Sequence, residues 1–237
     1  YGDRSHHSLD NEATSRMVSK MDTAKLSIQD VSFSYSDGTQ ALRDINLDIL
    51  ANELFVLFGP SRSGKSTLLR MLNRLSDLHE GTQRKGTILF DGRDIYHRAT
   101  NVIKLRRSIS MVFAVPTPLP GSIRDNMSYG LRMAGMKNQA EIDKRLEQAL
   151  RQAALWDEAK DRLDQSAFAL SGGQKQRLCI ARSLALEPDV ILLDNPTSGL
   201  DPISTATVEA SLAELKRDYT IIMVPHSVQQ AARIADR

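Results

Sequence analysis

The stretch Gly59-Pro60-Ser61-Arg62-Ser63-Gly64-Lys65-Ser66-Thr67 follows the apolar run 54–58 and precedes Leu68-Leu69-Arg70-Met71-Leu72. Its spacing fits G-x-x-x-x-G-K-[ST], the pattern of a phosphate-binding loop that joins a buried strand to a helix. In such a loop, consecutive backbone N–H groups face the phosphates, and the positive end of the helix points at them. A Gly- and Ser-rich turn without a ligand is the simpler alternative. The strand and helix on either side favour the phosphate-binding loop.

This loop also carries a cation and a hydroxyl where a polyphosphate ligand needs them. We expect Lys65 to reach the outer phosphates, and Ser66 to offer its hydroxyl to Mg²⁺, a hard cation that prefers oxygen ligands and keeps several waters. The candidate phosphate-binding residues are therefore Gly59, Pro60, Ser61, Arg62, Ser63, Gly64, Lys65, Ser66 and Thr67.

The composition limits the partners and the compartment. Lys and Arg number 31 against 29 Asp and Glu, so nothing in the charge balance demands nucleic acid or an anionic membrane. Cys179 is the only cysteine, which predicts a buried structural thiol in a reducing compartment. No stretch approaches the ~18 apolar residues of a membrane span, and residues 1–23 lack the apolar core of a signal peptide. We expect a soluble, cytoplasmic protein that reaches a membrane only through a partner.

The rest of the chain predicts an α/β fold. Residues 1–23 show no periodicity and are interpreted as a disordered leader or linker. Strands are predicted over residues 26–33, 42–49, 54–58, 86–92, 109–113, 190–193 and 220–224. Helices are predicted over residues 139–157, 176–186 and 202–216. The alternation indicates a mainly parallel core, which a helical insertion at about residues 115–170 interrupts.

Three residues at strand ends are candidates for the same site. Asp194 directly follows a buried strand, so its carboxylate would lie at the edge of the sheet where ligands bind in open α/β folds. His226 follows the last predicted strand in the same way. Tyr35 ends the first strand, where it either packs in the sheet or offers a platform for a nucleobase.

A second anion site is predicted at Ser171-Gly172-Gly173-Gln174. These residues precede the helical run 176–186, so their backbone N–H groups would lie at a helix N-terminus. Taken alone, such a segment is usually an ordinary loop. Its occurrence in the same sequence as the phosphate-binding loop supports a function in binding.

The motifs and their order resemble the ATP-binding subunits of ABC transporters, over about residues 25–236. The matching motifs are the loop 59–67, the segment 171–174, the strand into Asp194, the segment Ser198-Gly199-Leu200-Asp201, and His226. A narrower resemblance is to the subunits that drive phosphate import in bacteria. It is carried by residues 116–120, 153–156, 177–182, 201–205 and 229–233.

This resemblance implies a P-loop NTPase core of ABC ATPase type, with an inserted helical subdomain and an N-terminal antiparallel β part. Residues 24–237 would be one nucleotide-binding domain that binds ATP and Mg²⁺. Tyr35 would stack on adenine, Ser66 and Asp194 would hold the metal, and His226 would contact the γ-phosphate.

The implied assembly is a head-to-tail dimer with two anion sites around each nucleotide. The segment Ser171, Gly172, Gly173 and Gln174 of one chain would close over the phosphate-binding loop of the other. Closure would reach transmembrane permease subunits through the connector after Phe113, which places the chain on the inner face of the cell membrane. No nucleic acid is expected as a partner.

Several residues depart from the family pattern. Asn195 stands at the position of the usual catalytic glutamate, and an amide cannot accept a proton from the attacking water. Ala114 stands at the position of the usual glutamine. Arg62 replaces a glycine where a positive φ is favoured, and Pro225 replaces a residue with a backbone donor before the histidine. The chain also ends at Arg237, earlier than the family usually does.

These departures leave three interpretations open. The first is a subunit that couples ATP binding and hydrolysis to phosphate uptake, with slow hydrolysis. The second is a regulatory module that dimerises on ATP without hydrolysing it, which Asn195 and Ala114 favour. The third is a soluble ABC ATPase that acts on nucleic acid, which the near-neutral charge disfavours.

Overall fold

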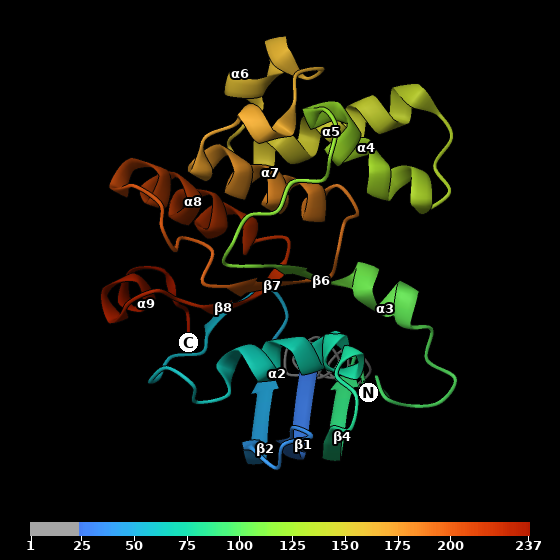
Figure 1. Ribbon diagram of the computed structural model, residues 1–237, viewed down its shortest axis with the longest axis vertical. Coiled ribbons are helices and arrows are strands. Elements are labelled where there is room, and N and C mark those ends of the chain that lie inside the picture. Colours follow the sequence, from blue (N-terminus) through green and yellow to red (C-terminus); the bar gives the residue numbers. More distant parts are fainter. Residues whose placement is uncertain (1–23) are drawn as a thin grey trace, which may run out of the picture.

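The computed structural model describes residues 24–237 and contains two four-stranded sheets with helices between and above them (Figure 1). The leader predicted for residues 1–23 lies outside the described residues. The antiparallel sheet has the order β2 (Gln40–Ile49), β1 (Leu26–Ser34), β4 (Gln83–Phe90) and β5 (Arg93–Asp94). The parallel sheet has the order β3 (Leu54–Val56), β8 (Thr220–Val224), β7 (Val190–Asp194) and β6 (Ile109–Val112).

The helices divide between the two faces of the parallel sheet. On one face, α2 (Lys65–Leu72) lies between the two sheets. On the other face lie the helices of the insertion together with α7 (Gly172–Leu184) and α8 (Pro202–Leu215) (Figure 1). The remaining helices are α3 (Val102–Ser108), α4 (Ile123–Met133), α5 (Gln139–Gln152), α6 (Trp156–Ala159) and α9 (Val228–Ile234).

Strand β7 shows why the parallel strands read as continuous apolar runs. Val190 and Leu192 pack in one core cluster, with β1, β4 and α2, whereas Ile191 and Leu193 pack in the other, with α4, α5, α7 and α8. Side chains alternate across a strand, so a sheet covered on both faces needs an apolar residue at every position. Strand β8 follows the same alternation. The α/β fold and the N-terminal antiparallel part are thereby confirmed.

The helical insertion begins with a well-capped helix. The Ser122 side chain accepts from the backbone N–H of Asp125, and the Asp125 carboxylate accepts from the Ser122 N–H, which forms a capping box at the start of α4. Helices α4 to α6 all lie between β6 and β7 in the chain.

One predicted helix is interrupted. The sequence predicts a single helix over residues 139–157, but α5 ends at Gln152 and α6 begins at Trp156. Ala154 between them has a φ of +52°, a left-handed conformation that a continuing helix does not allow. The sequence does not indicate this break, because Leu150 before the turn and Leu155 after it both pack in the core and keep the apolar pattern continuous.

Two further expectations concern Cys179 and membrane spans. Cys179 is buried in α7, as predicted, and its burial raises the pKa of the thiol. Within residues 24–237, none of the helices has the length and apolar character needed to cross a membrane.

The double burial of β7 predicts a large effect of truncation there. Leu192→Ala should lower the free energy of unfolding by about 2–5 kcal/mol. Leu192 is fully buried in the core cluster that includes α2, and the packed neighbours cannot move in to fill the cavity that the substitution leaves. Urea denaturation measures the change. The control is Leu78→Ala, at a leucine that is 69% exposed, which should change the value by less than about 0.5 kcal/mol. Equal effects of the two substitutions would contradict this account of the core.

Candidate functional site

The predicted phosphate-binding loop lines an open cleft of about 640 Å³. The cleft lies between this loop, the start of α2, the first antiparallel hairpin and the ends of β7 and β8. Of the residues predicted from sequence, those that line it are Tyr35, Gly59, Ser61, Arg62, Ser63, Gly64, Lys65, Ser66, Thr67, Asn195 and His226. The structure therefore brings together the loop and two strand ends that are more than a hundred residues away in the chain.

Two loop positions have left-handed backbone conformations. Gly64 has a φ of +86° at the N-cap of α2, and a Cβ there would collide with the carbonyl oxygen of Ala41. Only glycine fits that position. Arg62 has a φ of +62°, which confirms the expected positive φ and costs a non-glycine residue about 1–2 kcal/mol. Its side chain is exposed at the cleft.

Lys65 lies folded into the loop. Its ammonium donates to the carbonyl oxygens of Gly59 and Pro60, at 2.9 and 2.6 Å, and to the Ser63 hydroxyl at 3.1 Å. These contacts hold one positive charge within the ring of loop backbone. Pro60 thus contributes a carbonyl group to the loop, although it does not line the cleft.

Ser66 and Asp194 meet at the edge of the parallel sheet. The Ser66 hydroxyl donates to Asp194 Oδ1 at 2.9 Å, and Asp194 is buried at the end of β7. The pair offers two oxygen ligands, and no group of three or more His, Cys, Asp or Glu side chains suited to a metal occurs in residues 24–237. Such a pair fits Mg²⁺, which proteins usually hold with one or two side chains while phosphate oxygens and waters supply the rest.

Tyr35 lines the cleft and is held there by its neighbours. Its hydroxyl lies 2.8 Å from the Thr67 hydroxyl, and its ring packs edge-to-face on Phe33 and His79, with centroids 5.2 and 5.9 Å apart. His79 was not singled out from the sequence, because no local pattern connects it with a strand end. The packing holds the tyrosine ring in place while it lines the cleft.

Asn195 and His226 lie at the ends of neighbouring parallel strands. Asn195 has a φ of +49°, and its N–H donates to the carbonyl oxygen of Val224 at 2.9 Å. His226 is exposed, and its N–H donates to Gln230 Oε1. Pro225 between Val224 and His226 is buried. Ala114 follows β6 and does not line the cleft, so the structure does not join it to the other predicted residues.

The second predicted anion site lies elsewhere. Ser171 caps α7 by accepting from the Gln174 N–H, and the Gln174 side chain accepts in return from the Ser171 N–H. None of Ser171, Gly172, Gly173 and Gln174 lines the cleft. Helix α7 covers the face of the parallel sheet opposite to α2 (Figure 1). One copy of the chain therefore keeps the segment 171–174 outside the cleft that its own phosphate-binding loop lines.

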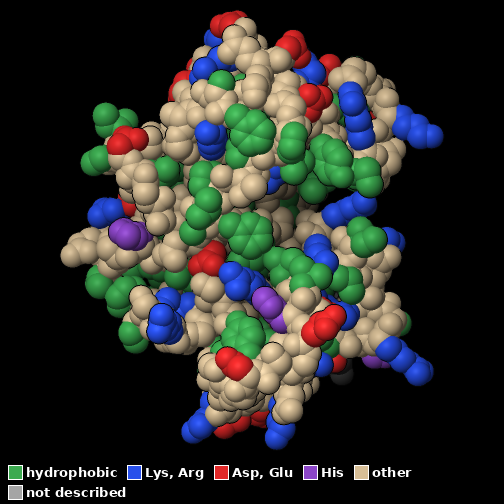
Figure 2. Space-filling view, viewed as in Figure 1, with side chains coloured by type: hydrophobic (Ala, Val, Ile, Leu, Met, Phe, Trp, Pro, Cys, Tyr) green, Lys and Arg blue, Asp and Glu red, His purple; other side chains and the backbone are tan. Residues whose placement is uncertain are grey.

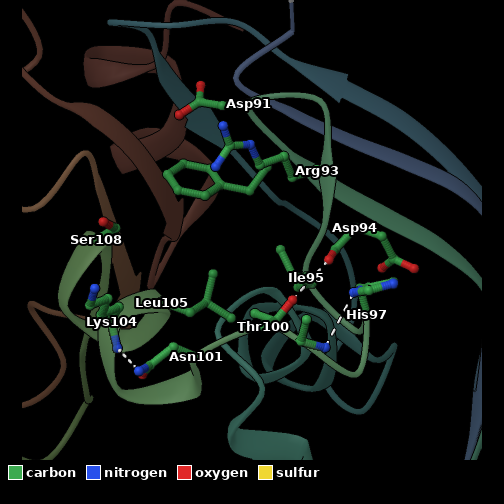
Figure 3. A pocket seen from close by; sticks show the side chains of 12 residues that line it. Asp91, Arg93, Asp94, Ile95, His97, Thr100, Asn101, Lys104, Leu105 and Ser108 are labelled. Carbon is green, nitrogen blue, oxygen red and sulfur yellow. Dashed lines mark hydrogen bonds between the residues drawn. The ribbon is translucent and has the colours of Figure 1, made fainter.

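A larger cavity, of about 860 Å³, lies between the β4–β5 turn and α3 (Figure 3). It contains none of the residues predicted from sequence. The polar groups drawn there mostly bond within their own loop, as Thr100 does to the Asp94 carbonyl oxygen and the Lys104 N–H does to Asn101. The cleft at the phosphate-binding loop is therefore the better candidate site.

Comparison with known proteins decides the family. The sequence pattern of the ABC transporter family matches residues 42–198. This chain belongs to the ABC transporter family. The fold class expected from the sequence, an ABC ATPase fold, is thereby confirmed.

Relatives of this ABC transporter chain include three bacterial proteins. "Phosphate import ATP-binding protein PstB" of Bacteroides thetaiotaomicron is 51% identical over 92% of this chain and 86% of its own. The protein of that name from Borreliella afzelii is 49% identical, over 93% and 86% of the two chains. "Phosphate import ATP-binding protein PstB 2" of Lactobacillus acidophilus is 51% identical, over 90% and 84%.

A solved structure is also similar to this ABC transporter chain. It is cbiO1 of Clostridium perfringens, described as part of the ABC transporter complex cbiONQ. The TM-score is 0.78 at 32% sequence identity, and the match covers 90% of this chain and 82% of that one.

An ion pair between a buried arginine and a partly exposed glutamate supports the second motif of this ABC transporter chain, and the sequence did not indicate it. Arg177 on α7 is buried and donates to Glu158 Oε1 at 2.6 Å, while the Gln174 amide donates to Glu158 Oε2 at 2.6 Å. The Arg177 guanidinium, followed by the Gln174 amide, lowers the pKa of Glu158 against the effect of burial. Glu158 lies 16 residues before Gln174, so no spacing within a helix could have indicated the contact.

This ion pair makes stability depend on pH. Glu158→Gln should lower the free energy of unfolding by about 1–2 kcal/mol at pH 7, a modest value because the Glu158 side chain is 43% exposed and solvent screens it. The folded pKa lies below the ordinary 4.5, so the pair stabilises the fold above pH 4.5 and the contribution is lost as the pH falls through the folded pKa. Urea denaturation of both proteins at pH 7 and pH 4 measures this. A difference that grows at the lower pH would contradict the assignment.

Proposed function

We propose that this chain is the ATP-binding subunit of an importer of inorganic phosphate. One observation carries the proposal: proteins named for phosphate import share 49–51% of their residues with it over 90–93% of its length. The cleft supports it, because the phosphate-binding loop, Lys65 and Ser66 line it, and Ser66 donates a hydrogen bond to the buried Asp194 carboxylate.

The residues of the cleft suit ATP with Mg²⁺. The N–H groups of the loop 59–64 and the start of α2 would face the β- and γ-phosphates, and Lys65 would leave its carbonyl partners for a phosphate oxygen. Tyr35, which lines the cleft, would stack on adenine. Ser66 and Asp194 would hold Mg²⁺, which neutralises charge on the outer phosphates when bound.

The cleft has no carboxylate at the position where the family usually has the base for the attacking water. His226 would contact the γ-phosphate from the end of β8. Asn195 would lie beside the water, where its amide can orient a water molecule but cannot take a proton at neutral pH. We therefore infer that hydrolysis by this chain is slow while binding of ATP is retained.

A second copy and membrane partners would complete the assembly. The segment 171–174 of one copy would close on the nucleotide of the other in a head-to-tail dimer, which explains why one chain carries its two anion sites apart. Large exposed apolar side chains at Phe113, Val115, Tyr129 and Met133 suit transmembrane permease subunits. Figure 2 shows hydrophobic side chains gathered in patches on one face of the molecule. The chain would then lie on the inner face of the cell membrane.

A non-hydrolysing switch is the second candidate function. It is favoured by Asn195, which lines the cleft at the position of the expected base, and by Ala114, whose methyl group cannot bind water or metal. In this case ATP would join two copies and release them only when nucleotide dissociates.

Phosphate uptake tests the leading proposal. We expect the chain to restore ATP-dependent uptake of labelled phosphate in proteoliposomes that contain the permease subunits of a close relative. Lys65→Ala should abolish uptake and weaken ATP binding by about 10- to 100-fold, since a charge-assisted contact is lost. Lys137→Ala, at an exposed lysine far from the loop in sequence, is the matched control and should leave both unchanged. Normal uptake with Lys65→Ala would rule out the proposed role of the cleft.

Substitution at position 195 separates the two candidate functions. Asn195→Glu should raise the rate of Mg-ATP hydrolysis by about 10²-fold, because it supplies a general base where the unaltered chain has an amide. Asn195→Gln is the control, because it has the side-chain length of glutamate but no base, and it should not show this gain in rate. ATP affinity is measured in each sample. An unaltered chain that turns over at about 1 s⁻¹ or faster would contradict the inferred slow hydrolysis.

A further inference from the structure

Gln230 on α9 is a buried amide that lies outside the cleft. It is only 2% exposed, and it is not among the residues that line the cleft. Its Oε1 accepts from the backbone N–H of His226 at 2.9 Å. Its Nε2 donates to the Thr197 hydroxyl at 2.8 Å and to Glu209 Oε1 on α8 at 3.0 Å. One side chain therefore joins a strand end, a turn and a neighbouring helix.

The orientation of this amide is fixed by its partners. The His226 N–H can only donate, so the oxygen of Gln230 must face it. The Glu209 carboxylate can only accept when ionised, so the nitrogen of Gln230 must face Glu209. Arg233 donates twice to Glu209 and is the main reason that the pKa of Glu209 is lowered. A flipped amide would face a donor with a donor and an acceptor with an acceptor.

The groups that Gln230 holds belong to two walls of the cleft. His226 lines the cleft after β8. Thr197 is buried in the turn after β7, between Asn195 and Ser198, which both line the cleft. A backbone hydrogen bond also joins the two walls: the Asn195 N–H donates to the carbonyl oxygen of Val224, the last residue of β8. The Gln230 side chain joins the two walls from outside the cleft, through its bonds to the His226 N–H and the Thr197 hydroxyl.

We propose that Gln230 is a positioning residue that holds His226 and the 195–198 turn at the separation needed for hydrolysis. The expected effect of Gln230 on hydrolysis rests on the proposed function of the cleft. Its expected effect on the position of the two walls does not. The amide does not touch the ligand, so its loss should change the rate of hydrolysis more than the affinity for ATP.

Exchanging the amide of Gln230 and the carboxylate of Glu209 gives a selective test. Gln230→Glu keeps the acceptor for the His226 N–H but loses both donors, and it faces the Glu209 carboxylate with a like charge. Adding Glu209→Gln restores a donor at the contact, and the Thr197 hydroxyl can donate in the reverse direction. The matched control is Gln229→Glu, at the preceding exposed residue of α9, which makes the same chemical change outside the network.

Hydrogen exchange of the unliganded protein measures the two walls directly. In Gln230→Glu we expect the His226 amide and the segment 196–200 to exchange at least about fivefold faster, both together. The double variant should return both to within about twofold of the unaltered chain, and Gln229→Glu should change neither. Faster exchange in only one of the two segments, or no recovery in the double variant, would overturn the proposal.

Hydrolysis and binding then test the catalytic consequence in the Asn195→Glu background, where turnover is expected to be measurable. Gln230→Glu should lower kcat by about tenfold or more with the ATP Kd changed less than about threefold, and Glu209→Gln should restore kcat. A change confined to Kd would overturn the positioning role. A parent protein that binds no ATP would instead overturn the proposed function, while the exchange experiment would still decide whether Gln230 couples the two walls.

Discussion

The parallel sheet β3-β8-β7-β6 is buried on both faces, and the positions of the other elements follow from that constraint. Helix α2 and the antiparallel sheet cover one face, while α7, α8 and the inserted helices cover the other (Figure 1). Polar residues enter strands enclosed in this way only with partners, as Ser110 does in β6 by bonding to Ser183, so most lie at the strand ends. Asp194, Asn195 and His226 occupy such ends. The cleft is therefore a consequence of how the core is covered.

The conformation of the backbone at this edge carries strain. Arg62 and Asn195 both have left-handed φ angles, and each lines the cleft from a different side. Asparagine tolerates that conformation better than most residues because its short side chain can bond locally, whereas arginine has no such compensation. Gly64 meets the same requirement without cost. The strain is held because α2 and β7 are both anchored in the core.

The two networks of buried polar side chains have parallel functions. Arg177 and Glu158 hold the start of α7, which carries the segment 171–174, and Gln230 with Glu209 holds the ends of β7 and β8. In each network an almost fully buried side chain, Arg177 or Gln230, forms hydrogen bonds to segments near a proposed binding surface. Gln230 is fully bonded and therefore favours one arrangement strongly, because any other leaves it without a partner, whereas the buried Nε of Arg177 has no partner. Both networks lie behind the surfaces that would meet the nucleotide.

The sequence by itself determined the phosphate-binding loop, the strand into Asp194 and the order of the motifs, since these depend on residues close together in the chain. It also determined the family, because the same local motifs carry the resemblance that the comparison confirmed. Only the tertiary structure decided that Asp194 meets Ser66, that the segment 171–174 stays apart from the cleft, and that Gln230 joins its two walls. Such contacts join residues that are far apart in sequence. Their geometry depends on how the whole core packs, which no local pattern records.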